Sequence, residues 1–237
     1  MGNDSRIPIA LLLDDSAPGI HIYEAHSRDV HGRAATRDGR PLLPRIPNSF
    51  LDDFADVAVR HGLAGKFSIV PNPGGRGNIP DQIRGVPPEA ARQWLETVQS
   101  RLASRFDFSP EMITHNMTLD LATGRFLDLN EHEWSQTQNR RRLTPYIAHA
   151  LSLLKGAGVD ATGVTSPWTF GSQVVDEYEA AIVAAQEQVY GRELSWYFCH
   201  MRALDLVGRR IREHLDAEVR WCSCSELCEE IATEAGR

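Results

Sequence analysis

The sequence predicts a single-domain α/β protein with a parallel sheet and one polar site at the carboxyl ends of its strands. Short apolar runs alternate with longer segments that have the 3.6-residue period of a helix, which is typical of repeated βα units. A chain of 237 residues can bury a sizeable core in one large domain, and no linker interrupts the alternation. We therefore treat residues 1–237 as one domain.

The net charge and the hydropathy of the chain argue against nucleic-acid-binding, membrane-spanning and secreted proteins. The formal net charge is −7, so the field of the whole protein repels nucleic acid. No apolar stretch approaches the roughly 20 residues that span a bilayer. The apolar segment 7–13 is too short and too soon followed by acidic residues to be a secretory signal. We expect a cytoplasmic protein that binds neither nucleic acid nor membrane, and the sequence leaves a homo-oligomer open.

The first expected strand covers residues 7–13, a continuous aliphatic run typical of strands covered on both faces. It ends at Asp14 and Asp15. A polar connection follows to about Asn48, far longer than the usual βα loop, and loops of that length usually serve function. Four of its side chains are either solvated or able to reach over the site: His21, His26, Asp29 and His31.

A helix with one apolar face over residues 50–58 comes next. Asn48 or Ser49 is expected to cap its start, and Gly62 to close its end. Residues 66–70 then form the second strand, which runs into a Gly- and Pro-rich stretch that excludes regular structure.

The next helix begins at Pro88, because proline suits the first helical position, and keeps its apolar face to Leu102. Residues 111–114 are expected to form the third strand, which ends at His115. A second long polar segment follows over residues 116–139.

The second half of the chain repeats the pattern. Its helices keep apolar residues at helical spacing and are bounded by prolines, glycines or caps. The first of these helices begins at Thr144 and Pro145, and the second begins near Ser172. The third covers residues 204–215, and the last follows a capping box formed by Ser223 and Glu226. The strands among them are residues 161–165, 194–199 and 218–222.

In a parallel α/β sheet every strand points its carboxyl end at the same face, so the residues that follow the strands converge in space. In this chain they are Asp14, Asp15, Asn72, His115, Asn116, Ser166, Trp168 and His200. Carboxylates, imidazoles and an aromatic ring together are the components of a hydrolytic centre that holds a metal and a sugar ring. The plainer interpretation is that adjacent aspartates cap a turn and that each histidine is structural.

The order of these motifs resembles that of the polysaccharide deacetylase superfamily over nearly the whole chain. Residues 11–15, Leu-Leu-Leu-Asp-Asp, resemble the first family motif. Residues 166–171 are similar to the groove motif, and residues 196–200 to the late strand that ends in histidine. The resemblance implies a distorted, TIM-like (β/α) barrel of six or seven βα units that removes acetyl groups from amino sugars.

The resemblance also implies roles for individual residues. Asp14 would be the general base, Asp15 and His115 ligands of a divalent Zn, Mn, Co or Ni ion, and His200 the general acid. The family has a second histidine four residues after the first, where this chain has Leu119, so Asp120, His132 or water would complete the metal site. We expect the carbohydrate or other small polar substrate to contact Asn72, Asn116, Asp120, Ser166 and Trp168.

Two alternatives stay open. A carbohydrate-binding protein that keeps the groove but has lost the metal is favoured by the missing histidine. A glycosidase on the same scaffold would use two carboxylates, such as Asp15 and Asp120, separated by roughly 5 to 9 Å.

Overall fold

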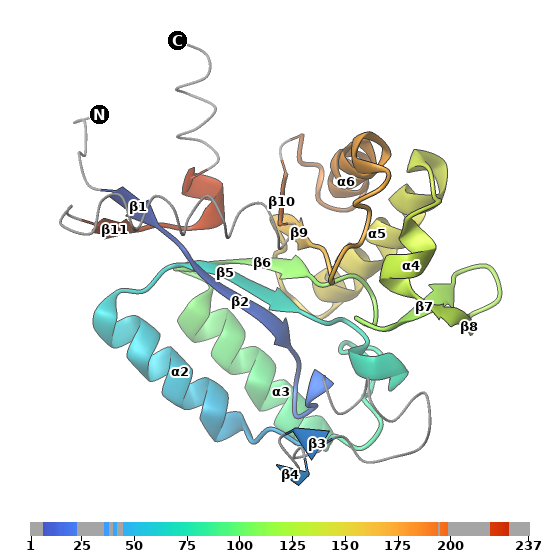
Figure 1. Cartoon of the computed structure of the whole chain (residues 1–237). Coiled ribbons are helices and arrows are strands. Elements are labelled where there is room, and N and C mark those ends of the chain that lie inside the picture. The colour runs from blue at the N-terminus through green and yellow to red at the C-terminus, as the bar shows by residue number, and fades with distance from the viewer. Residues whose placement is uncertain are drawn as a thin grey trace.

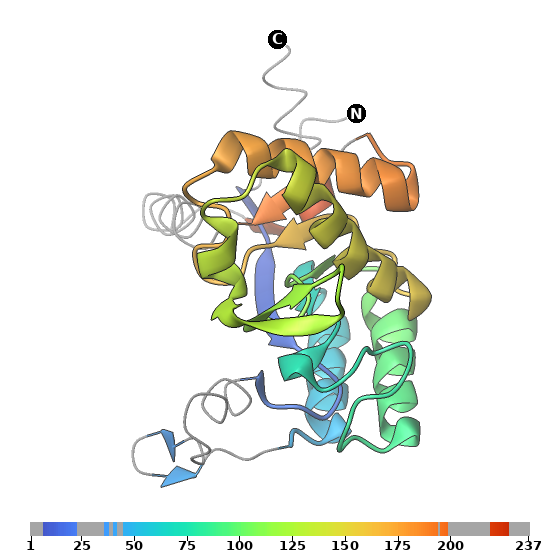
Figure 2. The same ribbon diagram turned by 90° about the vertical axis from the view of Figure 1, so that its right-hand side faces the viewer.

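Parallel strands with helices packed on both sides make up the architecture (Figures 1 and 2). The computed structural model describes residues 7–22, 36–37, 40–41, 45–193, 195–198 and 219–227. Within them, no helix combines the length and the apolar composition that crossing a membrane requires.

The central sheet has three parallel strands in the order β2–β5–β6. Their bounds are Leu11–Ser16, Gly65–Ile69 and Phe106–Pro110. Gly65 begins β5 opposite Leu11, at a point where an added Cβ would lie 1.9 Å from the Leu11 carbonyl oxygen. Only glycine therefore permits this pairing of β2 with β5.

The other strands form pairs. β1 (Ile7–Ile9) pairs in parallel with β11 (Val219–Trp221), and β9 (Gly163–Thr165) pairs in parallel with β10 (Trp196–Phe198). A single parallel bridge from Phe108 to Ala161 connects β6 to the segment before β9. Two hairpins are antiparallel: β3 (Thr36–Arg37) with β4 (Arg40–Pro41), and β7 (Met117–Asp120) with β8 (Arg125–Asn130). Across the described residues these sheets stay separate, so the α/β class with parallel strands is confirmed and the closed barrel remains a prediction.

Two groups of helices cover the strands. On one side of the central sheet, α2 and α3 lie side by side, and on the other side α5 packs against α6 (Figure 1). The bounds are α2 Asn48–His61, α3 Pro88–Thr97 with its π-helical continuation η2 Val98–Leu102, α4 Glu131–Ser135, α5 Arg140–Gly156 and α6 Val175–Tyr190. A short 3₁₀ turn, η1, covers Pro73–Gly75 inside the Gly- and Pro-rich stretch that was expected to lack regular structure.

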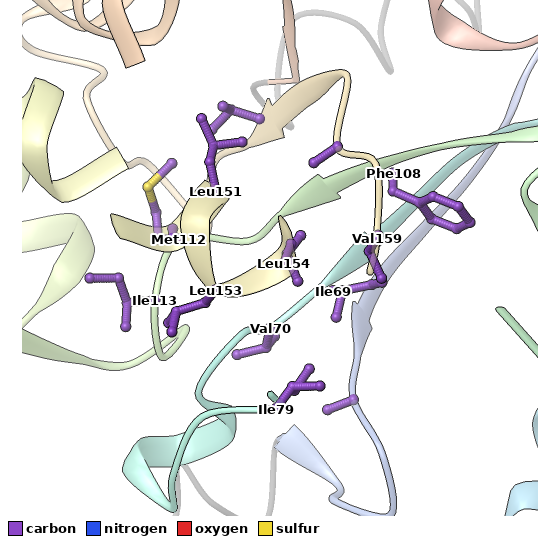
Figure 3. Close-up of a cluster of buried hydrophobic side chains, with 14 of the residues drawn as sticks. Ile69, Val70, Ile79, Phe108, Met112, Ile113, Leu151, Leu153, Leu154 and Val159 are labelled. Carbon is purple, nitrogen blue, oxygen red and sulfur yellow. The ribbon is translucent and has the colours of Figure 1, made fainter. Parts of the chain in front are cut away.

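Alternation along β5 gives the central sheet one apolar and one polar face. The Phe67 ring points to the helices, with centroids 6.3 Å from Phe54 of α2 and 6.1 Å from Trp94 of α3. Its neighbours Lys66 and Ser68 are fully buried on the opposite face. The same core cluster continues to α5, whose Leu154 side chain faces the region of Ile69 and Val159 (Figure 3).

Several helix and strand boundaries were wrong. The third strand covers Phe106–Pro110, whereas residues 111–114 form a loop after it. Met112 and Ile113 suggested a strand because they are apolar, but they are buried through an irregular backbone. The polar segment 116–139 also holds regular structure, namely β7, β8 and α4.

Two of the expected helix caps are confirmed, and the expected cap at the start of α2 was wrong. Gly62 closes α2 in the left-handed conformation, and Ser223 and Glu226 exchange the two hydrogen bonds of a capping box, so both predictions are confirmed. The start of α2 has Pro47 at the cap without a side-chain bond, because the Asn48 amide donates to the Ala90 carbonyl instead.

Two further helix starts were wrong. α5 begins at Arg140, where the Asn139 side chain accepts from the Arg142 N–H, and Pro145 lies inside the helix near its start. α6 begins at Val175 rather than near Ser172. The expected helix over residues 204–215 lies outside the described residues.

Candidate metal centre

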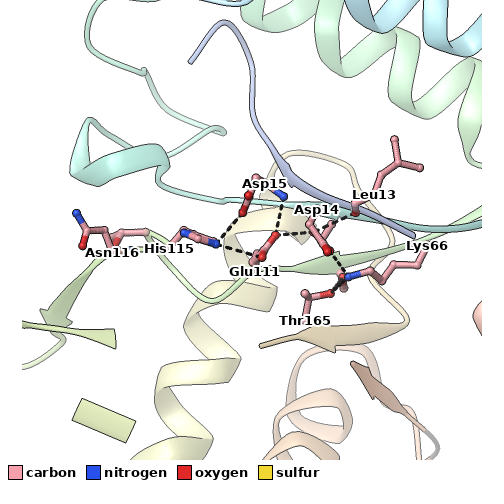
Figure 4. A network of polar contacts seen from close by, with 11 residues as sticks. Leu13, Asp14, Asp15, Lys66, Glu111, His115, Asn116 and Thr165 are labelled. Atoms are coloured by element: carbon pink, nitrogen blue, oxygen red, sulfur yellow. Dashed lines mark hydrogen bonds and ion pairs between the residues drawn. The ribbon is translucent and has the colours of Figure 1, made fainter. Parts of the chain in front are cut away.

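Polar side chains from neighbouring strands meet at the carboxyl end of the central sheet (Figure 4). Asp14 and Asp15 stand near the end of β2, Glu111 directly follows β6, and His115 lies four residues further along the loop. β2 and β6 both flank β5, so the sheet itself sets the spacing between these groups.

Three of these side chains point their ligand atoms at a common place. His115 Nε2 lies 2.7 Å from Asp15 Oδ1 and 3.2 Å from Glu111 Oε1. All three atoms lie within 4.8 Å of one another. The Glu111 side chain is fully buried and that of His115 is 4% exposed, whereas Asp15 is 20% exposed and gives the cluster its contact with solvent.

The hydrogen bonding of the cluster fits a bound cation. Among the described residues, neither Asp15 Oδ1 nor Glu111 Oε1 has a hydrogen-bond partner of good geometry, although both are buried. One imidazole N–H cannot point at two oxygens, but a metal about 2.0–2.2 Å from each ligand atom leaves those atoms about 3 Å apart, close to the two separations from His115 Nε2. Two carboxylates and one imidazole suit Zn or Mn better than Ca or Mg, which prefer oxygen ligands alone.

Neighbouring donors fix the orientation of the Glu111 carboxylate. Its Oε2 accepts a hydrogen bond of 2.6 Å from Ser68 Oγ and one of 2.7 Å from the Asp15 N–H. Because Oε2 is held in this way, Oε1 turns towards His115 and Asp15. Such outer contacts set the geometry of ligands in known metal sites.

Asp14 belongs to a different part of the network. It forms an ion pair with Lys66, which is fully buried, and its Oδ1 lies 3.2 Å from Ser68 Oγ, whose proton goes to the nearer Glu111. Lys66 Nζ also donates to Thr165 Oγ1 at 2.9 Å, which in turn lies 2.7 Å from Ser109 Oγ. The polar face of the sheet thus joins β2, β5, β6 and β9 beneath the cluster.

The two innermost groups of the cluster are oppositely charged without a metal. Burial alone would lower the pKa of His115, but the short contacts of its Nε2 with the Asp15 and Glu111 carboxylates, and their negative charge, raise it to about 10. Burial likewise favours neutral Glu111, yet His115, Lys66 and Ser68 together lower its pKa to about 2. An imidazolium therefore stands in the metal-free protein where a cation would bind.

Backbone strain concentrates at the site. Among the described residues, four that are not glycine have positive φ: Asp15 at 61°, Met112 at 51°, His115 at 66° and Trp168 at 46°. Two of them are proposed ligands, Met112 follows the third ligand Glu111, and the Trp168 ring contacts His115. Strained backbone persists only where the surroundings hold it, and it is characteristic of functional sites.

An aromatic group lies beside the cluster. The Trp168 ring lies edge-on to His115, with centroids 5.1 Å apart, and to His132, with centroids 4.7 Å apart. The Trp168 residue is 37% exposed, so part of the indole is available to a ligand. His132, from α4, therefore lies against Trp168, and the pKa of its imidazole is lowered, mainly by burial.

The remaining residues that the sequence singled out make local contacts. Asn72 Oδ1 accepts from the Gly77 N–H, and Ser166 Oγ lies 2.8 Å from the Tyr178 hydroxyl. Asp120 accepts from the Ala122 N–H and the Thr123 hydroxyl in the β7–β8 turn, and these bonds lower its pKa. The Asn116 carbonyl accepts from the Glu131 N–H. Contact of these residues with a substrate stays a prediction, and His200, His26, Asp29 and His31 lie outside the described residues.

A separate apolar cleft of about 160 Å³ opens beside the end of β2. Asp14 and Asp15 line it together with aromatic side chains of the other sheet face, including Phe54, Phe67 and Trp94. Neither Glu111 nor His115 lines this cleft, so it is not the space in which the ligand atoms converge.

Two residues of the network were missed from the sequence. From the sequence, Glu111 was expected inside the third strand. The strand in fact ends at Pro110, so Glu111 is a strand-end residue, four positions before His115. Lys66 was also placed in a strand, and a lysine in an otherwise uncharged strand was the available signal of a buried ion pair.

The chain was compared with known proteins. No protein-family model matches it, and no curated protein matches its sequence. Among solved structures it is similar to a CE4 family pseudoenzyme from Bacillus anthracis, with a TM-score of 0.37 and 11% identity over 77% of this chain and 61% of that one. Two mutants of that pseudoenzyme, one with restored enzymatic activity, also have TM-scores of 0.37, at 8% and 7% identity over 75% of this chain and 52% and 53% of theirs. This chain thus spans about half to three-fifths of those structures, and a similarity of this size carries nothing about function.

Proposed function

We propose that this protein is a metal-dependent hydrolase that removes an acyl group from an amino sugar or a similar small polar substrate. The observation that carries the proposal is the convergence of Asp15 Oδ1, Glu111 Oε1 and His115 Nε2, with both oxygens lacking other partners among the described residues. The Leu-Leu-Leu-Asp-Asp strand end and its resemblance to deacetylases support the choice of reaction.

The chain's own residues would bind, orient and transfer protons. A divalent ion at the cluster would supply polarisation of the substrate carbonyl and a bound water of lowered pKa. Asp14 would accept the proton of the attacking water while Lys66 holds its carboxylate in place. The part-exposed Trp168 ring would lie against the sugar, and His200 would protonate the leaving amine.

The test combines metal content with turnover. We expect purified protein to retain about one Zn, Mn, Co or Ni ion per chain and to deacetylate acetylated amino sugars. Asp15→Ala, Glu111→Ala and His115→Ala should each lose both properties, whereas Asp14→Ala should lose turnover but keep the metal. Protein that binds none of these metals, or turnover that survives Glu111→Ala, would contradict the proposal.

A second function is favoured by one contact. The Asp14 carboxylate forms an ion pair with fully buried Lys66, so the oxygen that would face an attacking water is already engaged within the protein. A carbohydrate-binding protein without turnover fits this arrangement. Saturable sugar binding that Trp168→Ala abolishes, together with no hydrolysis in metal-loaded protein, would select it.

A further inference from the structure

The loop that carries His115 has a strained backbone, and a buried carboxyl group, that of Glu131, binds it through its amide groups. Met112 and His115 both have positive φ, and Ile113 and Thr114 lie between them. Glu131, the first residue of α4, is 1% exposed and lies against this loop. Non-glycine residues adopt such conformations only where neighbouring groups compensate for the strain.

Glu131 contacts the loop through both its side chain and its backbone. Its Oε1 accepts hydrogen bonds from the Ile113 N–H at 2.9 Å and from the Thr114 N–H at 3.0 Å. Its own N–H donates to the Asn116 carbonyl at 2.7 Å. One residue therefore binds the loop on both sides of His115.

α5 in turn orients the Glu131 side chain. The Tyr146 hydroxyl donates to Glu131 Oε1 at 2.7 Å and accepts from the Leu119 N–H at 3.2 Å. Glu131 Oε1 thus receives three donors, all of them buried, and has little freedom to move. Burying a carboxyl group is costly unless hydrogen bonds satisfy it, and a satisfied buried network is rigid, so these bonds fix Glu131 and its donors relative to each other.

We infer that Glu131 is a positioning residue that sets the distance between Glu111 and His115 and so prepares the cluster for its cation. This inference rests on the metal site proposed above. Glu131 does not lie among the converging ligand atoms and contacts no reacting atom. It acts on the backbone between the two ligands, which are four residues apart in a loop. On a helix, side chains four residues apart would be neighbours through the helix geometry alone, but a loop needs other contacts to bring them together.

The experiment compares three variants in the full chain, using Zn²⁺ and Mn²⁺ in competition with a chromophoric chelator. Glu131→Ala removes the acceptor, and we expect metal affinity to fall by about 10- to 100-fold, as for other outer contacts of metal sites. Glu131→Gln keeps an acceptor oxygen at the same place and should retain most of the affinity. Glu133→Ala, the matched control, removes an exposed acid that caps the start of α4 without contacting the loop, and should bind like wild type.

A second readout separates positioning from general stability. In metal-free protein, the Ile113 and Thr114 amides should exchange with solvent faster in Glu131→Ala, with little change in Glu131→Gln or Glu133→Ala. A structural role alone would lower the free energy of unfolding but leave the affinity of the folded fraction unchanged. If Glu131→Ala does not fold, Tyr146→Phe removes one donor from Oε1 and should weaken metal binding several-fold.

The outcomes are distinct. Wild-type metal affinity in Glu131→Ala, or in Tyr146→Phe where that variant is used, overturns the inference. Equal loss of affinity in Glu133→Ala also overturns it, because loosening of α4 would then be the cause. If wild-type protein binds no metal, the proposed function fails, and amide exchange alone decides whether Glu131 positions the loop.

Discussion

At the residue scale, Glu131 shows how the burial of a single carboxyl group affects its pKa and the stability of the fold. Burial raises its pKa to about 7, against the opposing effect of the Thr114 and Ile113 amides and the Tyr146 hydroxyl. Lys66 is a buried charge of another kind, because its ion pair with the partly exposed Asp14 offsets the cost of burying the ammonium group. Removing one partner of such a pair would leave an uncompensated charge, whereas Glu131 can become neutral by binding a proton.

The shifted pKa of Glu131 predicts a pH dependence of stability in chelator-treated protein. The folded state holds the Glu131 proton more tightly than the unfolded chain, in which the pKa of a glutamate is 4.5. Its contribution to stability is therefore fully present below about pH 4.5 and is lost as the pH rises through 7. Relative to the non-titrating variant Glu131→Gln, wild-type protein should lose about 3 kcal/mol between these limits.

Urea unfolding of the two proteins at pH 4.5, 6 and 8 measures this loss. Groups that titrate in both proteins cancel in the difference, which isolates Glu131. Unfolding free energies that stay parallel across this range would show that the Glu131 carboxyl does not have a raised pKa.

At the scale of elements, the helices and strands differ in how far the sequence predicts them. The helices α2, α3, α5 and α6 have apolar faces at helical spacing and were expected close to where they lie. The strand β6 was misplaced because the buried apolar pair Met112 and Ile113 was taken for strand residues, although Phe106 and Phe108 alternate with polar residues as in a strand. Periodicity reports which side chains are buried, and it cannot separate a buried loop from a strand.

The same limit explains what was found of the candidate site. Asp15 and His115 were expected together because both follow strands, and the structure places them 2.7 Å apart. Glu111 was missed through one wrong boundary, and Glu131 because its role depends on contacts with a distant loop. Long-range hydrogen bonds of this kind leave no pattern in a single sequence.

Pairing of β2 with β5 depends on Gly65, which allows an element-scale prediction. An alanine Cβ at this position would lie 1.9 Å from the Leu11 carbonyl oxygen, so the strands must separate or the backbone must shift. We expect Gly65→Ala to destabilise the protein by more than about 3 kcal/mol, in the range of severe overpacking. Because Asp15 is carried by β2, the variant should also lose metal.

Gly85→Ala is the matched control, since Gly85 also has positive φ but nothing lies within 4 Å of an added Cβ. It should cost only the backbone strain, on the order of 1 kcal/mol. Urea unfolding of both variants measures the difference. Equal destabilisation would mean that the contact with Leu11, and with it the strand pairing, does not matter.

At the scale of the whole molecule, the cluster connects parts of the chain that are far apart in sequence. Asp15 comes from β2 and Glu111 from the end of β6, and the Asp15 N–H already bonds to Glu111 across 96 residues. A cation bound by both carboxylates would hold these strands together only in the folded state. Metal binding should therefore act on the stability of the whole protein.

Thermal unfolding with and without metal tests this connection and also identifies the third ligand. A metal at 100 times its Kd stabilises the folded state by about 2.7 kcal/mol, which raises the Tm of a chain of this size by roughly 5–10 °C. Asp15→Ala and Glu111→Ala should abolish this rise.

Asp120→Ala and His132→Ala should keep the rise in Tm, because Asp120 is bonded within the β7–β8 turn and His132 lies against Trp168. A rise that persists in Glu111→Ala but disappears in Asp120→Ala or His132→Ala would assign the third ligand as the sequence had proposed, and Glu111 would then be a structural carboxylate.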